Sequence, residues 1–397
     1  MTRGLGRVLL LGALSTVLDV GVFVALRAGL DWGLVPADVV ALTLAAATAY
    51  ALHRATATAD DPYARWVDRP AAFVRVSLVA GVVDVAVVLG LAALFDPATA
   101  VAVLAVKVPA LVVAGLVRSA GERRVLFRLV RDEQVNRVPR PVPPGDVRLS
   151  VVVPAYREAE RIGATVAALR DALAGVAAEG GLEVVVVDDG SGDGTAEAAR
   201  VGGADVVLEQ PENRGKGAAV RRGALAAGGR TIAFTDADLS YSPDQLLGLL
   251  AEVEDGWDVV VGSRRHDDTT TLVKARRLRE IGGRAINVLT QVVLLGQYRD
   301  TQCGLKAFRS DVARLLFGRS RIDGFAFDVE LFHLAERYRL SLTEVPVSVE
   351  NSPRSTVRVA RDATRLVRDL FRIRRWAKRG AYDDAEAGAG DRALPRA

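Results

Sequence analysis

The sequence has little of what disulfide or zinc chemistry requires. Its 397 residues include a single cysteine, Cys303, and three histidines. One cysteine excludes a disulfide within the chain, and without clustered cysteines or histidines a thiolate or imidazole zinc site is not expected. Any metal ion is therefore predicted to be held by carboxylates.

Charged residues are scarce in the first third of the chain, where apolar runs dominate. Each run is near the roughly 20 residues that cross a bilayer. No small-residue cleavage site follows the first run, so it is expected to stay attached. We predict an all-α transmembrane domain of four helices over residues 1–130, with the lipid bilayer as a partner. The runs are approximately Val8–Leu30, Leu34–Leu52, Val74–Phe95 and Ala98–Val117.

The four runs read as two copies of a hairpin, because Asp19 and Asp84 occupy equivalent places in similar sequences. Lys107 is a third ionisable residue inside an apolar run. An ionised group costs a few kcal/mol at the centre of a bilayer, so these side chains are expected to face the bundle interior. Two interpretations stay open, a structural ion pair and a site for a lipid head group.

Basic residues predict the orientation of the runs. Arg3 and Arg7 precede the first run and Arg118 follows the fourth, whereas the two opposite loops carry Asp31 and Asp96. Because cytoplasmic loops are enriched in lysine and arginine, both termini and everything after residue 118 are predicted to be cytoplasmic.

A second domain is predicted after a proline-rich linker, residues 131–147. Over residues 148–350, short β-branched runs alternate with the helical patterns Glu158–Ala178 and Lys216–Ala227. This rhythm predicts an α/β domain with a mainly parallel sheet, covered on both faces, that binds ligands at the carboxyl ends of its strands. The predicted strands are Leu149–Val153, Val184–Val187, Val206–Leu208, Thr231–Thr235 and Val259–Val261.

Arginines recur every three or four residues from Arg354 to Arg379, with Leu366, Leu370 and Ile373 on another helical face. We predict a basic amphipathic helix over 351–380 that lies on anionic lipid. The alternative is a helix packed against the second domain. The tail, 381–397, is predicted to be disordered.

Carboxylates follow two of the predicted strands directly. Val184–Val187 runs into Asp188-Asp189-Gly190-Ser191, and Thr231–Thr235 runs into Asp236-Ala237-Asp238. In an extended tip Asp236 and Asp238 project on the same side, as a hard divalent cation such as Mg²⁺ or Mn²⁺ requires. Lys216, beside glycines at a predicted helix start, is placed to face phosphate.

Four motifs in order carry a resemblance to a known family. They are Pro154-Ala155-Tyr156-Arg157-Glu158, Asp188-Asp189-Gly190-Ser191, Asn213-Arg214-Gly215-Lys216-Gly217 and Asp236-Ala237-Asp238. The chain resembles glycosyltransferase family 2, with the GT-A fold, over roughly residues 148–350. Within that family it looks like the polyprenyl- or dolichyl-phosphate glucose or mannose synthases. This narrower resemblance depends on Gly262-Ser263-Arg264, Asp300–Phe308, Phe327–Glu330 and Glu344–Val347. The N-terminal half resembles the GtrA-like four-helix membrane family.

The resemblance implies roles for individual residues. Those expected to bind the nucleotide-sugar donor are Pro154, Tyr156, Glu158, Val187, Asp189, Lys216 and Ala237. Asp236 and Asp238 would hold the metal and the diphosphate, and Asp328 would organise the acceptor side. Arg264 and Arg279 are the candidates for steering the acceptor phosphate.

The implied reaction transfers a hexose, with inversion, from a nucleotide sugar to polyprenyl or dolichyl phosphate at the cytoplasmic membrane face. UDP-glucose is the favoured donor, because Glu350 and Thr356 stand where mannosyl-type synthases carry an arginine and a lysine. GDP-mannose is the alternative donor. A second alternative is a lipid-sugar translocator or scaffold with a non-catalytic nucleotide-sugar-binding domain. No nucleic-acid partner is expected, and a homo-oligomer is left open.

Overall fold

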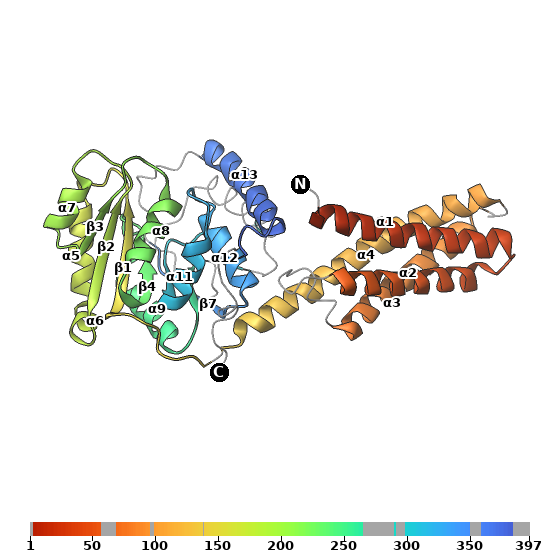
Figure 1. Cartoon of the computed structure of the whole chain (residues 1–397), viewed down its shortest axis with the longest axis horizontal. Coiled ribbons are helices and arrows are strands. Elements are labelled where there is room, and N and C mark those ends of the chain that lie inside the picture. The colour runs from red at the N-terminus through yellow and green to blue at the C-terminus, as the bar shows by residue number, and fades with distance from the viewer. Residues whose placement is uncertain are drawn as a thin grey trace. The chain divides into compact units, whose positions relative to one another are not determined.

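The computed structural model describes residues 3–56, 69–95, 99–137, 139–264, 290, 298–349 and 359–383. The chain divides into two compact units, Met1–Val130 and Arg131–Ala397 (Figure 1). The first unit is helical, and the second combines helices with a β-sheet.

The helical unit consists of α1 (Arg3–Val24), a five-residue π-helix (Ala25–Gly29), α2 (Leu34–Thr56), α3 (Pro70–Ala92) and α4 (Ala100–Val135), whose last residues belong to the second unit. Within the described residues, three segments are long and apolar enough to cross a membrane: Leu34–Ala55, Pro70–Ala92 and Val101–Val135. The chain is an integral membrane protein, as predicted, while a fourth span through α1 and the orientation stay predictions.

Small and β-branched side chains form the core of the helical unit. Ala37, Ala41 and Ala110 are fully buried, and Phe23 and Val103 pack with them. Alanine lets helices approach closely, which favours packing in lipid, where no hydrophobic effect drives helices together. Asp19, Asp84 and Lys107 face this interior, as expected, and they pair.

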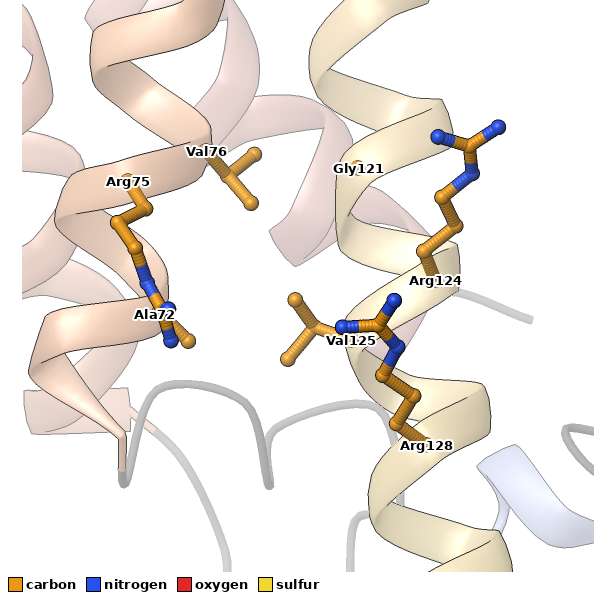
Figure 2. Close-up of a pocket in the computed structure, with 7 residues that line it drawn as sticks. All are labelled: Ala72, Arg75, Val76, Gly121, Arg124, Val125 and Arg128. Atoms are coloured by element: carbon orange, nitrogen blue, oxygen red, sulfur yellow. The ribbon is translucent and has the colours of Figure 1, made fainter.

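A pocket of about 230 Å³ lies between α3 and α4. Gly121 permits the close approach of the helices here, since an added Cβ would lie 2.9 Å from Cγ1 of Val76. Figure 2 shows Val76 and Val125 pointing into the gap, with Arg75 on α3 and Arg128 on α4. The lining combines apolar and cationic side chains: Ala72, Arg75, Val76, Gly121, Arg124, Val125 and Arg128.

The fourth helix continues beyond the end of its apolar run, so the first five residues of the predicted linker, Arg131–Val135, are helical. The prolines after it lie outside the helices and strands, and the second unit holds them. Arg309 Nη2 donates to the Pro141 carbonyl at 2.7 Å, and Ser310 Oγ donates to the Pro144 carbonyl at 2.5 Å. Proline has no N–H but keeps its carbonyl acceptor, so the segment still forms these bonds.

The second unit contains one seven-stranded sheet in the order β3-β2-β1-β4-β6-β5-β7. The pairs β1–β2, β1–β4, β2–β3 and β5–β7 are parallel, whereas β6 is antiparallel to both its neighbours. The strands are β1 (Val147–Ala155), β2 (Leu182–Asp188), β3 (Val206–Glu209), β4 (Gly229–Phe234), β5 (Val259–Ser263), β6 (Lys306–Arg309) and β7 (Leu342–Pro346).

The five predicted strands fall on β1 to β5, and only β4 stops short, one residue before its predicted end. The centres of β1 and β2 are fully buried valines, as expected for strands covered on both faces. Figure 1 shows helices on both sides of the sheet, with α5 and α7 on one face and α8 and α11 on the other. The mainly parallel α/β class is therefore confirmed. The helices are α5 (Ile162–Ala172), α6 (Ala174–Ala178), α7 (Thr195–Val201), α8 (Lys216–Ala226), α9 (Gln245–Glu254), α11 (Ser310–Arg319), α12 (Phe327–Arg337) and α13 (Val359–Lys378).

The basic C-terminal helix, α13, buries its apolar face in the second unit. Leu366, Leu370 and Ile373 are at most 4% exposed and belong to the core of that unit, whereas Arg368 and Arg372 are exposed. The apolar face is thus not available for insertion into lipid, and contact of α13 with the membrane surface stays a prediction. Only the basic face remains for contact with anionic lipid.

Candidate active site

The candidate site lies where the strand order reverses. From β1 the chain continues to β2 on one side, whereas β4 pairs with β1 on the other. In open α/β sheets the crevice outside the carboxyl ends at such a switch point is the usual ligand site. Tyr156 follows β1 and Asp236 follows β4, so the first and last of the four motifs flank one crevice.

Four charged side chains meet beside this crevice. Lys216 Nζ, in the first residue of α8, lies 2.5 Å from Asp236 Oδ1. Lys306 Nζ, on β6, lies 2.6 Å from Asp328 Oδ1, on α12. Lys216 also interacts electrostatically with Asp328, which joins the two pairs. Two lysines alternate with two aspartates, so the group is neutral overall when all four are ionised.

Burial and neighbouring charges act in opposite directions on these groups. Burial raises the pKa of the Asp328 carboxyl, and Lys306 and Lys216 oppose that rise. Burial alone would lower the pKa of Lys216, but Asp236 and Asp328 more than compensate and raise it. Lys216 therefore stays a cation at neutral pH and suits contact with a phosphate.

Asp236 and Asp238 have the donor chemistry for a hard divalent cation. Asp238 Oδ1 accepts a hydrogen bond from the Ser240 backbone amide at 3.1 Å. Leu239, between these two residues, adopts a positive φ of 46°, which turns the chain directly after Asp238. Among the described residues, no three His, Cys, Asp or Glu side chains are grouped to hold a metal. Mg²⁺ commonly takes only one or two carboxylates plus substrate phosphate oxygens, and the two aspartates fit that partial set.

Gly304 packs directly on the Asp236 carboxylate. A Cβ added at Gly304 would lie 2.9 Å from Asp236 Cγ and nearer still to Oδ2. Only a residue without a side chain fits there while the carboxylate keeps its place. This contact was not predicted, although Gly304 stood within the Asp300–Phe308 motif.

Asp189 organises the loop that leads into α8. Its Oδ1 accepts the Gln210 side-chain amide at 2.7 Å and the Arg214 backbone amide at 2.9 Å, while Oδ2 accepts the Gly215 amide at 2.8 Å. Burial raises the pKa of Asp189, and the two backbone hydrogen bonds oppose the rise. Asp189 thus positions Lys216, a role that the sequence did not reveal, and Gln210 is its unforeseen partner.

The other predicted donor-binding residues differ in how far their side chains are exposed. Tyr156 is 41% exposed, with the Arg157 guanidinium 5.3 Å from its ring centroid, so an aromatic surface is open to a ligand. Burial raises the pKa of the Glu158 carboxyl, and repulsion by the Asp238 carboxylate adds to the rise. Val187 is fully buried in the core, so its side chain does not line an open pocket, and a donor-binding role for this position stays a prediction. Ala237 is also buried, and its carbonyl accepts the Thr165 hydroxyl at 2.7 Å.

Pro154, the last of the predicted donor-binding residues, is half-buried near the end of β1 and pairs in register with Val187. It therefore lies at the edge of the same crevice.

Arg264 forms a bidentate pair with Asp300. Its Nε and Nη2 donate to the two carboxylate oxygens at 2.6 and 2.9 Å. Burial alone would raise the pKa of Asp300, but Arg264 outweighs it and lowers the pKa to about 2. These bonds use two of the five guanidinium N–H donors, which leaves others to meet a phosphate. Arg279, Glu350 and Thr356 lie outside the described residues.

Comparison with known proteins finds matches for both units of the chain. Residues 150–317 match the model of glycosyl transferase family 2, and residues 7–127 match the GtrA/DPMS transmembrane domain. A dolichyl-phosphate beta-glucosyltransferase of Drosophila melanogaster is 37% identical over 243 residues, which cover 57% of this chain and 74% of the relative. The dolichyl-phosphate beta-glucosyltransferase of Saccharomyces cerevisiae is 30% identical over 262 residues, 60% of this chain and 78% of the relative.

Solved structures are more distant. Glucosyl-3-phosphoglycerate synthase from Mycobacterium tuberculosis, in complex with Mn²⁺, UDP and glucosyl-3-phosphoglycerate, is 21% identical with a TM-score of 0.42, covering 63% of this chain and 83% of that one. Mannosyl-3-phosphoglycerate synthase from Rubrobacter xylanophilus is also 21% identical, with a TM-score of 0.44, covering 63% of this chain and 79% of that one.

The chain belongs to glycosyl transferase family 2, and a GtrA/DPMS-type transmembrane domain precedes its catalytic domain. Within that family it is a glycosyltransferase of the dolichyl-phosphate beta-glucosyltransferase type. Both statements confirm the resemblances found in the sequence.

Proposed function

We propose that the protein transfers glucose from UDP-glucose to polyprenyl or dolichyl phosphate, with inversion at the anomeric carbon. The observation that carries the proposal is the charged group Lys216–Asp236–Asp328–Lys306 at the switch point of the sheet. It offers a cation for the donor diphosphate beside carboxylates for a divalent metal. The similarity to dolichyl-phosphate beta-glucosyltransferases supports the choice of sugar and acceptor.

In this proposal the donor side is formed by β1, β4 and the start of α8. Tyr156 covers the base, and the loop fastened by Asp189 presents Lys216 to the diphosphate. Asp236 and Asp238 would hold Mg²⁺ or Mn²⁺, which when bound neutralises charge on the departing nucleoside diphosphate. Positioned charges of this kind are often the largest single contribution to lowering a barrier.

The acceptor needs no protein base, because a phosphate monoester is already ionised near neutral pH. This agrees with Asp328, which is 5% exposed and paired with Lys306, and so is poorly placed to take a proton from an incoming acceptor. We assign Asp328 to holding Lys306 and Lys216 in place. Arg264 is the described candidate for guiding the acceptor phosphate, since Asp300 already fixes its orientation.

We further propose four membrane passes, with both termini and the catalytic domain on the cytoplasmic side. The clustered arginines after the fourth apolar run support this orientation. The exposed arginines of α13 would add attraction to anionic lipid at about 1 kcal/mol per basic residue near the surface.

The test is transfer of labelled sugar to lipid by membranes that contain the full chain. Label is expected to enter the lipid from UDP-glucose and not from GDP-mannose. Asp238→Asn should lower the rate about 100-fold or more. Asp171→Asn is the matched control, because Asp171 is exposed in the last turn of α5, at the far end of that helix from the carboxyl end of β1, and it should leave the rate unchanged.

Each alternative gives a distinct result. Transfer only from GDP-mannose would replace glucose by mannose. Binding of UDP-glucose with no transfer, or an Asp238→Asn variant as active as the wild type, would refute the catalytic assignment and favour a binding or translocating protein.

A further inference from the structure

Four ionisable side chains, one from each of the four long helices, meet inside the helical unit. Asp19 of α1, Asp38 of α2, Asp84 of α3 and Lys107 of α4 are all at most 2% exposed. Lys107 Nζ lies 2.5 Å from Asp38 Oδ1, 2.7 Å from Asp84 Oδ2 and 3.3 Å from Asp19 Oδ2. We call these residues the buried ion cluster.

The cluster contains more acid than base. Three carboxylates face one ammonium, which leaves two negative charges uncompensated if all four groups are ionised. A buried charge costs several kcal/mol unless it is paired. Arg27, which follows Asp19 on the same chain segment, does not supply the missing charge, because its guanidinium pairs with the exposed Asp31 at 2.8 Å.

The cluster also has too few hydrogen-bond donors for its carboxylate oxygens. Lysine has three N–H donors, and three carboxylates surround it. The second oxygen of each aspartate, Asp19 Oδ1, Asp38 Oδ2 and Asp84 Oδ1, is buried with no hydrogen-bond donor. Buried carboxylate oxygens without donors are costly, so the cluster lacks donors as well as positive charge.

A proton on a carboxyl supplies both missing features. It removes one negative charge, and it converts one acceptor oxygen into an O–H donor for a neighbour. Asp38 and Asp84 bind the same ammonium and also interact with each other, so a proton between them would complete both side chains.

The cluster also excludes one of the two sequence-based interpretations. It is fully enclosed and carries excess negative charge, so a phosphate head group would neither reach it nor be attracted to it.

All four residues of the cluster lie toward the same end of the helical bundle. At about 1.5 Å per residue, Asp38 is about 6 Å from the start of α2, Lys107 about 10 Å from the start of α4, Asp84 about 12 Å from the end of α3 and Asp19 about 8 Å from the end of α1. The cluster is therefore nearer to the end of the bundle that carries the π-helix Ala25–Gly29 and residues 93–95 than to the opposite end.

We propose that the buried ion cluster is a proton-binding site of the membrane domain, in which Asp38 and Asp84 share a proton beside the Lys107 ammonium. The site exchanges this proton through the nearby loop side of the bundle. The proposal is independent of the sugar or acceptor assigned to the catalytic domain.

Infrared spectroscopy of the full chain in lipid nanodiscs near neutral pH tests the proposal directly. The wild type should show a carbonyl stretching band of a protonated carboxyl that shifts on exchange into deuterated water. Asp38→Asn and Asp84→Asn should each remove this band. Asp31→Asn is the matched control in a 96% exposed position and should retain it. Identical spectra for the wild type and both cluster variants would overturn the proposal.

Thermal unfolding against pH gives a second, independent reading. Only the folded state holds the shared proton, so its contribution to the stability of the wild type should fall as the pH rises above about 4, the ordinary pKa of an aspartate in the unfolded chain, and through the pKa of the cluster. Asparagine provides both an oxygen and an N–H donor without charge, so Asp38→Asn should lack this fall and gain a few degrees relative to the wild type at the alkaline end.

The remaining outcomes contradict the proposal. If sodium, at constant ionic strength, raises the melting temperature of the wild type but not of Asp38→Asn, and no protonated band is found, the site holds a metal cation. If Asp38→Asn and Asp84→Asn are less stable than the wild type at every pH, with no band, the cluster is a structural ion pair alone.

Discussion

Replacing Gly304 by alanine should damage the active site while the fold stays intact. The new Cβ would lie 2.9 Å from Asp236 Cγ and nearer still to Oδ2. Packed carbon and oxygen atoms stay about 3.5 Å apart, so the carboxylate must move by about 1 Å. Gly304 is not among the described glycines with positive φ, so alanine brings no backbone strain of its own.

The Asp236 carboxylate cannot move freely away from the new Cβ, because its Oδ1 is paired with Lys216 Nζ at 2.5 Å. A displacement of about 1 Å in a reacting constellation costs about 100-fold in rate, which corresponds to about 2.7 kcal/mol of transition-state stabilisation. We therefore expect kcat/KM for transfer of labelled sugar to lipid to fall about 100-fold in Gly304→Ala, with a melting temperature close to that of the wild type.

The control is a glycine with open space around it. A Cβ added at Gly248, in α9, would have nothing within 4 Å, so Gly248→Ala should keep full activity and gain slightly in stability. If Gly304→Ala transfers sugar at the wild-type rate, the Asp236 carboxylate does not need its observed position and its assignment to the active site is wrong.

Three further predictions concern stability. Asp300→Asn should destabilise the full chain by about 2 kcal/mol at neutral pH, because Arg264 lowers the pKa of Asp300 from 3.8 to about 2 and the ionised form stabilises the fold. In the wild type this contribution to stability should disappear as the pH falls from 3.8 to about 2. Equal thermal stability of the two proteins near neutral pH would contradict the prediction. Ile373→Ala should lower the free energy of unfolding by about 2–5 kcal/mol, because it leaves a cavity under α13. Phe371→Ala, at a 65% exposed position, should lower it little. Loss of vesicle binding by Ile373→Ala with no loss of stability would show that the apolar face of α13 lies on the membrane. Tyr382→Phe should cost about 1 kcal/mol or more, because Glu330 loses the hydroxyl donor at 2.6 Å, and chemical denaturation measures it.

The sequence was sufficient for the parts of the fold that local pattern determines. Continuous valine runs such as Val184–Val187 have no amphipathic alternative, and acidic residues at their ends locate the crevice. β6 and β7 were not predicted, because Lys306–Arg309 and Leu342–Pro346 are short, carry charges and become strands only through pairing with their neighbours.

Contacts between distant segments could not be predicted in the same way. Asp38 lies close to the start of α2, and only the packing of four helices shows that it shares Lys107 with Asp84. Lys306 and Gly304 were visible as members of a motif, but their partners, Asp328 and Asp236, depend on how β6 enters the sheet.

The proline-rich segment determines where the chain can be cut. Arg140 lies 3.1 Å from Asp258, and the carbonyls of Pro141 and Pro144 accept hydrogen bonds from Arg309 and Ser310. A fragment that starts at residue 148 would strip partners from three polar side chains of the catalytic unit. One that starts upstream of residue 134 would keep them, together with the Gln134 amide that donates to the Tyr298 hydroxyl. A soluble version of the enzyme should therefore retain the end of its last membrane helix.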